Sequence, residues 1–145
     1  MAFASASSHW NPIHPIHAIL LAFPFPMFLA ALVSDVAYWQ TFQIQWANFS
    51  AWLIAVGLLG GGFALLWALV NLFRFRGLGF SRPQTYFVVL LVMFAVGFIN
   101  ALVHAKDAAA TMPTGLYLSI VATLFALVAA VIGYSGFRSV EVRDA

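Results

Sequence analysis

The ten charged side chains of this 145-residue chain are so unevenly distributed that they leave four long uncharged stretches. They are Asp35, Arg74, Arg76, Arg82, Lys106, Asp107, Arg138, Glu141, Arg143 and Asp144. A helix that crosses the ~30 Å hydrocarbon core of a bilayer needs about 20 mostly apolar residues. The sequence therefore predicts an all-α polytopic membrane protein, a four-transmembrane-helix bundle with spans over 16–38, 49–73, 85–104 and 115–137. These spans form one membrane domain over 1–145, in which 1–15 is a polar N-terminal tail.

The composition excludes several other classes of protein. Hydrophobic residues make up 64% of the chain and charged residues only 7%, whereas about 25% of the residues of an ordinary soluble domain are charged. A soluble globule, a disordered chain and a nucleic-acid-binding protein are all incompatible with so little polar surface. The absence of cysteine excludes disulfides and thiolate metal sites. The apolar runs also lack the alternation of membrane barrel strands.

The positions of the basic residues predict how the chain is oriented. Four spans place both termini and the second loop on one side of the membrane, with Arg74, Arg76, Arg82, Arg138 and Arg143. The other side has only Lys106. Because short cytoplasmic loops are enriched in Lys and Arg, we expect a bacterial inner-membrane protein with both termini cytoplasmic. The first and third loops then face the periplasm.

Small residues and prolines in the first two spans predict how the helices pack. Gly57 and Gly61 have the four-residue spacing that lets two membrane helices approach closely. They are expected to pack against the third or fourth span, with a subunit interface as the alternative. Pro24 and Pro26 each remove a backbone donor, so the first span should kink there. The kink is either a packing element or an opening for a cofactor or lipid.

Aromatic residues are concentrated around the first periplasmic connection. They are Tyr38, Trp39, Phe42, Trp46, Phe49 and Trp52. Trp and Tyr favour the headgroup level of a bilayer, so an aromatic anchor is expected, with a quinone or ligand platform as the alternative. Residues 41–46 alternate polar and apolar side chains, which suggests a short strand-like or irregular segment at the interface.

Two histidines at the start of the first span are the candidate cofactor ligands. Pro15 suits the first position of a helix, which places His14 at the N-cap and His17 about one turn later, near the cytoplasmic interface. The two would approach a metal from the same side, so haem b would need a further ligand from His9, a methionine such as Met27 or Met93, or a second subunit. No cofactor is required by the sequence. Interfacial histidines that cap or hydrogen-bond are the simpler interpretation.

A second group of polar residues is predicted at the periplasmic end of the third span. Asn100, His104 and Asp107 share a helix face if the helix continues. Asn100 should face protein, since polar groups are costly in lipid. Asp35, near the same end of the first span, is expected to be solvated. The group could bind a partner, a proton or a quinone headgroup, or it could simply secure the end of the third helix.

Catalytic patterns are otherwise missing from the sequence. The carboxylates are too few for paired acid–base chemistry, and Gly60, Gly61 and Gly62 lie in an apolar run instead of a phosphate-binding loop. A stand-alone enzyme is therefore not predicted.

The chain resembles a bacterial family of small integral membrane proteins, domain of unknown function 2231. Asn11-Pro12-Ile13-His14-Pro15, Phe23-Pro24, Asp35, the stretch from Ile99 to Asp107, and Met112-Pro113-Thr114-Gly115 carry the resemblance over most of the chain. This chain departs from the family pattern at Asn11, where many relatives have a histidine, and in the longer spacing between His-Pro and Phe-Pro. Relatives are similar to accessory proteins associated with periplasmic redox enzymes.

Three functional hypotheses follow. The first is a non-catalytic membrane subunit that anchors or organises a larger respiratory or redox assembly together with other membrane subunits. The second is a b-type haem or quinone-reactive electron-transfer protein that uses His14, His17 or His104. The third is a lipid or small-solute carrier with a cavity at Pro24 and Pro26.

Overall fold

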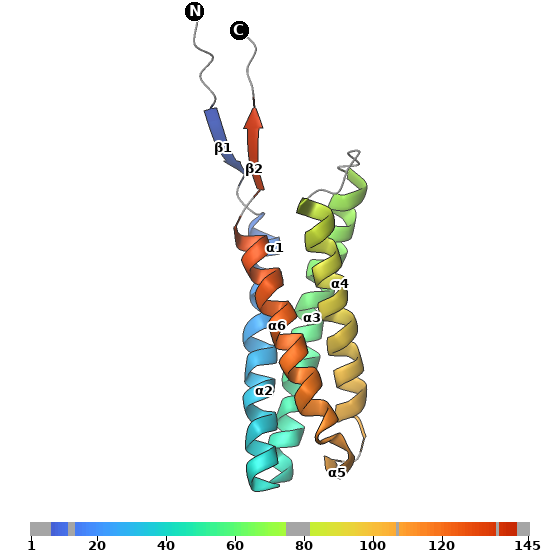
Figure 1. The fold of residues 1–145 in the computed structure, drawn as a ribbon. Helices are drawn as coiled ribbons and strands as arrows, with labels where there is room; N and C mark the ends of the chain where they lie inside the picture. The colour runs from blue at the N-terminus through green and yellow to red at the C-terminus, as the bar shows by residue number, and fades with distance from the viewer. Residues whose placement is uncertain (1–6, 12–13, 75–81, 107, 136, 142–145) are drawn as a thin grey trace, which may run out of the picture.

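The computed structural model describes residues 7–11, 14–74, 82–106, 108–135 and 137–141, with side chains over 14–73, 83–106 and 110–135. Its elements are β1 (Ser7–Asn11), α1 (Pro15–Ala22), α2 (Pro24–Thr41), α3 (Ile44–Arg74), α4 (Arg82–His104), α5 (Ala108–Thr111), α6 (Thr114–Tyr134) and β2 (Phe137–Glu141). The helices form an upright bundle (Figure 1). In the described part of the chain, four helical segments are long and apolar enough to cross a membrane, with α1 and α2 forming one of them.

Consecutive spans are antiparallel neighbours around the bundle. The first span packs against α3 and α6, and α4 packs against the same two helices. This arrangement gives the bundle two different ends (Figure 1). At the α5 end lie the last residues of α2 and α4, the first residues of α3 and α6, and α5 itself. At the strand end, β1 and β2 extend beyond α1 and α6.

The two strands are a feature that the sequence did not predict. Ser7 pairs with Glu141 and Asn11 with Phe137 in an antiparallel ladder. Part of the predicted polar tail is therefore β1, and Phe137, the predicted last residue of the fourth span, begins β2 after α6 has ended at Tyr134.

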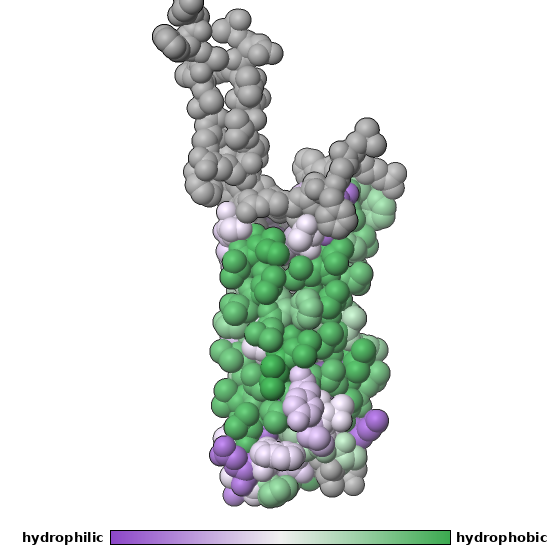
Figure 2. All heavy atoms as spheres, in the orientation of Figure 1, coloured by the Kyte–Doolittle hydropathy of each residue, from purple (hydrophilic) through white to green (hydrophobic). Residues whose placement is uncertain are grey.

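The core of the bundle is built largely from small side chains. Among the described residues, seven of the buried apolar ones are alanines: Ala31, Ala47, Ala64, Ala68, Ala122, Ala126 and Ala129. Large apolar side chains instead cover the outside, as at Leu59, which is 63% exposed, and Figure 2 shows a continuous apolar belt along the face in view. Lipid tails solvate such a surface, whereas small residues inside let the helices pack closely. The fold is therefore an all-α membrane bundle, as the sequence predicts.

The first span is interrupted where its prolines occur. Phe23 forms a turn between α1 and α2, and its N–H donates to the Leu20 carbonyl at 3.5 Å. Pro24, which cannot donate a backbone hydrogen bond, is buried, whereas Pro26 is exposed on the outside of the bundle. Pro24 is therefore the proline that packs inside the bundle at the kink, whereas Pro26 points away from the other helices.

The glycines of α3 lie where this kinked span approaches most closely. A Cβ at Gly57 would lie 3.2 Å from Met27 Cβ, and one at Gly61 would lie 2.8 Å from Met93 Cε and 3.4 Å from Pro24 Cγ. Gly61 therefore faces the third span as well as the first. Gly57 faces the first span instead of the expected third or fourth, because this part of α3 packs against α2. These contacts are within the chain.

Gly60 provides the sharpest test of this close approach. A Cβ there would lie only 2.6 Å from Phe23 Cβ and 3.3 Å from the Leu20 carbonyl oxygen, so backbone would have to move. We expect Gly60→Ala to destabilise the bundle by about 1–3 kcal/mol from overpacking, partly offset by up to ~1 kcal/mol of helix propensity. Unfolding in detergent, followed by circular dichroism, measures the change.

Gly62→Ala is the matched control on the same helix. Its nearest neighbour would be the Phe94 ring edge at 3.1 Å, and a ring can shift more easily than backbone. Equal losses in the two variants would contradict the packing of Phe23 on α3.

Candidate functional site

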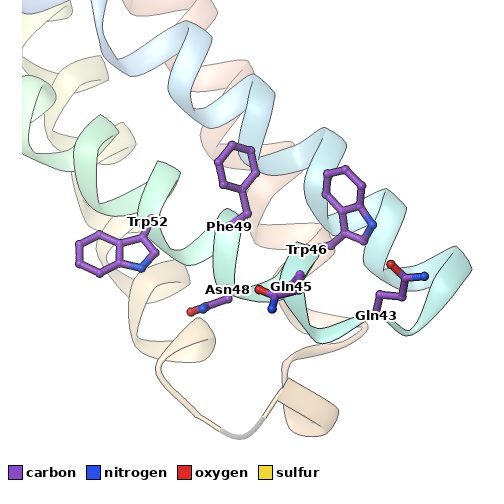
Figure 3. Close-up of a pocket in the computed structure, with 6 residues that line it drawn as sticks. All are labelled: Gln43, Gln45, Trp46, Asn48, Phe49 and Trp52. Atoms are coloured by element: carbon purple, nitrogen blue, oxygen red, sulfur yellow. The ribbon is translucent and has the colours of Figure 1, made fainter.

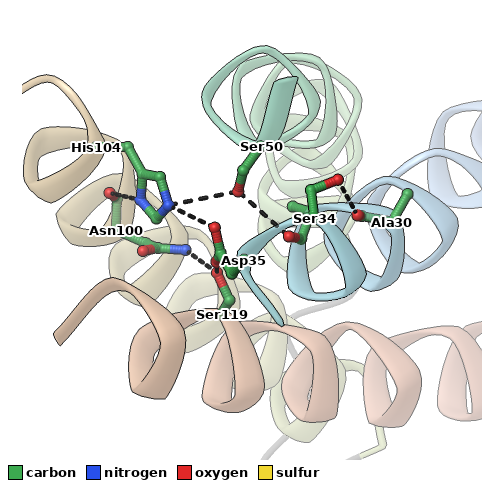
Figure 4. Close-up of polar contacts among 8 residues, drawn as sticks. Ala30, Ser34, Asp35, Ser50, Asn100, His104 and Ser119 are labelled. Atoms are coloured by element: carbon green, nitrogen blue, oxygen red, sulfur yellow. Dashed lines mark hydrogen bonds and ion pairs between the residues drawn. The ribbon is translucent and has the colours of Figure 1, made fainter. Parts of the chain in front are cut away.

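Five polar side chains meet inside the bundle near the α5 end, and we call them the polar network. Every span contributes: Asp35 from α2, Ser50 from α3, Asn100 and His104 from α4, and Ser119 from α6 (Figure 4). Asp35 is 0% exposed, which differs from the solvated position expected from the sequence. It lies six residues before Thr41, the end of α2, or about 9 Å at 1.5 Å per residue. The other helices cover it at that depth.

The hydrogen bonds of the network converge on Asp35. His104 Nε2 lies 2.9 Å from Asp35 Oδ1, and the Ser119 hydroxyl donates to Asp35 Oδ2 at 2.5 Å. Asn100 Nδ2 donates to Ser119 Oγ at 2.8 Å. Ser50 Oγ lies 3.3 Å from His104 Nε2. The network thus links all four spans through a single carboxyl group.

The hydrogen-bond partners determine the protonation of His104. Its Nδ1 is 3.0 Å from the Asn100 carbonyl oxygen, which can only accept, so Nδ1 carries a hydrogen. Ser50 has one hydroxyl hydrogen and donates it to the Ala31 carbonyl at 3.3 Å. Nε2 faces Asp35 Oδ1 at 2.9 Å and Ser50 Oγ at 3.3 Å, and a hydrogen on Nε2 satisfies both acceptors. We therefore assign His104 as an imidazolium that is paired with an Asp35 carboxylate.

Neither partner of the ion pair is accessible to water. The side chains of His104 and Asp35 are 1% and 0% exposed. Charged groups at membrane depth are costly unless they are paired and hydrogen-bonded, and here each oxygen of Asp35 accepts a hydrogen bond. Gly115 makes room for the pair, because a Cβ on it would lie 2.8 Å from His104 Cε1.

The arrangement is unlike that of a catalytic serine. In a Ser-His-Asp triad, serine and aspartate bond to different ring nitrogens. In this chain Asp35 and Ser50 both contact Nε2, whereas Nδ1 is occupied by the Asn100 carbonyl. The buried residues of the network leave no surface for a substrate to reach.

The structure brings together three of the four residues predicted for this group, Asp35, Asn100 and His104. The fourth, Asp107, lies outside the described residues, and α4 ends at His104. Ser50, Ser119 and Gly115 were missed by the sequence analysis. The only signal for them is that each lies within two turns of a helix end at the same side of the bundle, which becomes visible once the helix ends are known.

His14 and His17 lie at the strand end, far along the bundle from the polar network. His14 is the N-cap of α1, with no side-chain cap hydrogen bond, and Pro15 follows it in the first turn. His17 is 4% exposed, and its Nε2 lies 2.8 Å from the Tyr86 hydroxyl. Both imidazoles contact the indole of Trp67, with ring centroids 4.9 and 6.0 Å away.

These contacts do not fit a haem. His17 Nε2, the outer nitrogen of the ring, is taken by Tyr86, and His14 and His17 lie on the same indole instead of opposing each other across a gap. Met93, a candidate further ligand, is buried against Gly61 in the core. No group of three or more metal-binding side chains occurs among the described residues.

The aromatic connection at the α5 end is a tight turn between two helices. α2 ends at Thr41 and α3 begins at Ile44, so the strand-like or irregular segment expected over 41–46 is instead a two-residue break between helices, at Phe42 and Gln43. The start of α3 bears an open hollow of about 490 Å³, lined by Gln43, Gln45, Trp46, Asn48, Phe49 and Trp52 (Figure 3). Three amides and three aromatic rings line this uncharged surface, which we call the aromatic hollow.

The apolar exterior, the four spans and the buried ion pair define a multi-pass integral membrane protein. A family model described as "Predicted membrane protein (DUF2231)" matches residues 13–143. The chain belongs to this family, as the sequence resemblance predicts. No curated protein and no solved structure matches it.

The Asp35–His104 pair is testable by a double-mutant cycle. Asp35→Asn and His104→Gln should each destabilise the bundle by about 3–5 kcal/mol, because each leaves the other group without its partner. The double variant removes both charges, so its loss should be smaller than the sum by about 1–3 kcal/mol. Unfolding in detergent provides the free energies.

Ser34→Ala is the control for this cycle. Ser34 is buried next to Asp35 in the chain, but its hydroxyl donates to the Ala30 carbonyl of its own helix at 2.8 Å (Figure 4). It should show no coupling with His104→Gln. Additive losses for Asp35 and His104 would refute the ion pair.

Proposed function

We propose that this chain is a non-catalytic subunit that anchors or organises a larger assembly in the bacterial inner membrane. The polar network supports this proposal, because its groups bond to one another across four helices and are buried away from any substrate. A bundle locked in this way is a rigid scaffold. Its contacts with other molecules are then made by its outer surface.

The conformation and exposure of Phe42 are the main support for this proposal. The residue has a φ of 53°, a left-handed conformation that costs an L residue roughly 1–2 kcal/mol. Its side chain is nevertheless 77% exposed, with an edge contact to Tyr38 at 6.4 Å between ring centroids. Glycine would suit this backbone better if only the turn mattered. A strained, exposed aromatic residue is typical of a binding surface.

Phe42 adjoins the aromatic hollow, and together they make a surface suited to a transmembrane helix of another membrane protein. The described side chains of the hollow are uncharged, so recognition rests on ring packing and on amide hydrogen bonds, which hold membrane helices together. Trp52, 69% exposed, provides a large apolar contact. The polar network holds this surface in place, because Asp35 and Ser50 fix the two helices on either side of the turn.

The orientation of the subunit follows from the basic residues of the sequence. With both termini cytoplasmic, the α5 end and Phe42 lie at the periplasmic face of the membrane. A respiratory or redox assembly is the proposed class of partner, in keeping with the accessory role that the sequence resemblance implies. Of the two redox alternatives for the chain itself, a quinone fits the residues at the strand end better than a haem.

Phe42→Gly separates the binding role from folding. Glycine relieves the left-handed backbone, so we expect the stability of the bundle to stay unchanged or to rise by up to about 1 kcal/mol. The assembly should nevertheless lose this subunit on purification in mild detergent. Unfolding curves and native gels of the same preparations measure the two effects.

A photoreactive phenylalanine analogue placed at position 42 identifies the partner directly. The matched control carries it at Leu127, which is 41% exposed on the lipid-facing side of α6. We expect one discrete crosslinked membrane protein from position 42 and none from position 127. Crosslinks to lipid alone, or a chain that runs alone at its native expression level, would refute the subunit role and leave an aromatic anchor.

A further inference from the structure

We propose that His17 and Trp67 form a binding site for a membrane-soluble quinone, a flat ring that carries carbonyl oxygens. The site lies at the strand end of the bundle and is independent of the docking surface around Phe42. It rests on an unpartnered buried nitrogen. His17 Nδ1 has no hydrogen-bond partner among the described residues, although the atom is buried and the residue is only 4% exposed. A ligand therefore reaches this nitrogen only if a neighbouring side chain moves.

The hydrogen bond between His17 and Tyr86 indicates which ring nitrogen of His17 carries a hydrogen. If the Tyr86 hydroxyl donates to His17 Nε2, the ring hydrogen sits on Nδ1 and only that donor is unpaired. If Nε2 donates instead, both Nδ1 and the tyrosine hydrogen are left unpaired. Because unpaired buried polar groups are costly, the first arrangement is favoured. His17 therefore presents a buried N–H that lacks an acceptor.

Trp67 supplies a flat surface next to this donor. The His17 ring is stacked on the indole with an interplanar angle of 22°, and the exposed His14 ring lies on the same indole at 35°. Because His14 makes no side-chain cap hydrogen bond, it can turn out towards the headgroups. This movement would uncover the part of the Trp67 indole that His14 contacts, and the proposed site requires it.

The depth of the site selects the ligand. His17 lies in the first turn of α1, two residues after Pro15, so it is about 3 Å into the span at 1.5 Å per residue. A quinone dissolved in the membrane can place its ring at this level, stack it on Trp67 and accept the Nδ1 hydrogen through a carbonyl oxygen. Ester carbonyls of phospholipids offer the same acceptor at the same level, but they have no ring.

The two nitrogens of His17 can be tested separately. An asparagine amide reaches the position of histidine Nδ1, whereas a glutamine amide reaches that of Nε2. His17→Gln therefore keeps the contact with Tyr86 and loses the donor, and His17→Asn keeps the donor and loses the contact. The probe is a short-chain ubiquinone analogue, titrated into nanodiscs of ether-linked lipids that lack ester carbonyls, with quenching of tryptophan fluorescence as the readout.

We expect saturable quenching in the natural protein and in His17→Asn, and an affinity weaker by about tenfold or more in His17→Gln. Trp67→Phe should remove the saturable component, whereas Trp52→Phe, at the opposite end, should retain it. Unsaturable quenching throughout, or equal affinities in both His17 variants, would overturn the site. Either result would leave the docking of partners at Phe42 unaffected, because that is measured by crosslinking.

Discussion

The pairing of Asp35 with His104 is the interaction on which the rest of the bundle depends. The interior of a membrane offers no water to a polar group, so each donor and acceptor has to find a partner in the protein. Asp35 finds its partners on α4 and α6, and His104 adds a contact to α3. One carboxylate thereby fixes the relative positions of four helices that are otherwise held by the packing of small apolar side chains.

The same requirement gives the two ends of the bundle different characters. At the α5 end the polar side chains bond to one another across all four spans, and only the side-chain oxygen of Asn100 lacks a partner among the described residues. The helices are therefore held firmly there, and an exposed, strained aromatic residue can persist beside them. At the strand end His17 Nδ1 is a nitrogen donor without a partner in the described part of the chain. The first end is suited to contact with another protein, and the second retains capacity for a small hydrogen-bond acceptor.

Much of the fold was predictable from the sequence because lipid imposes simple rules on it. The gaps between charges predicted four spans, and Pro24 predicted the kink. The sequence grouped Asp35 with His104, but it did not predict the two serines that complete the network. Ser119 bonds to Asp35 and Ser50 contacts His104, and both are ordinary in apolar helices and meet these partners only after the spans are aligned. The burial of Asp35 was missed for the same reason, since its depth alone says nothing about which helices cover it. The turn at Phe42 was missed because local alternation suggested a strand where helix packing favours a short connection.

The ladder of β1 and β2 has a consequence for anything attached to this bundle. Asn11 and Phe137 pair nearest the helices, and Ser7 and Glu141 pair furthest from them (Figure 1). Five residues of strand amount to a stem of about 16 Å at 3.3 Å per residue. A domain fused to either strand would stand off the bilayer by that length, and two such domains would emerge side by side, as on a common stalk.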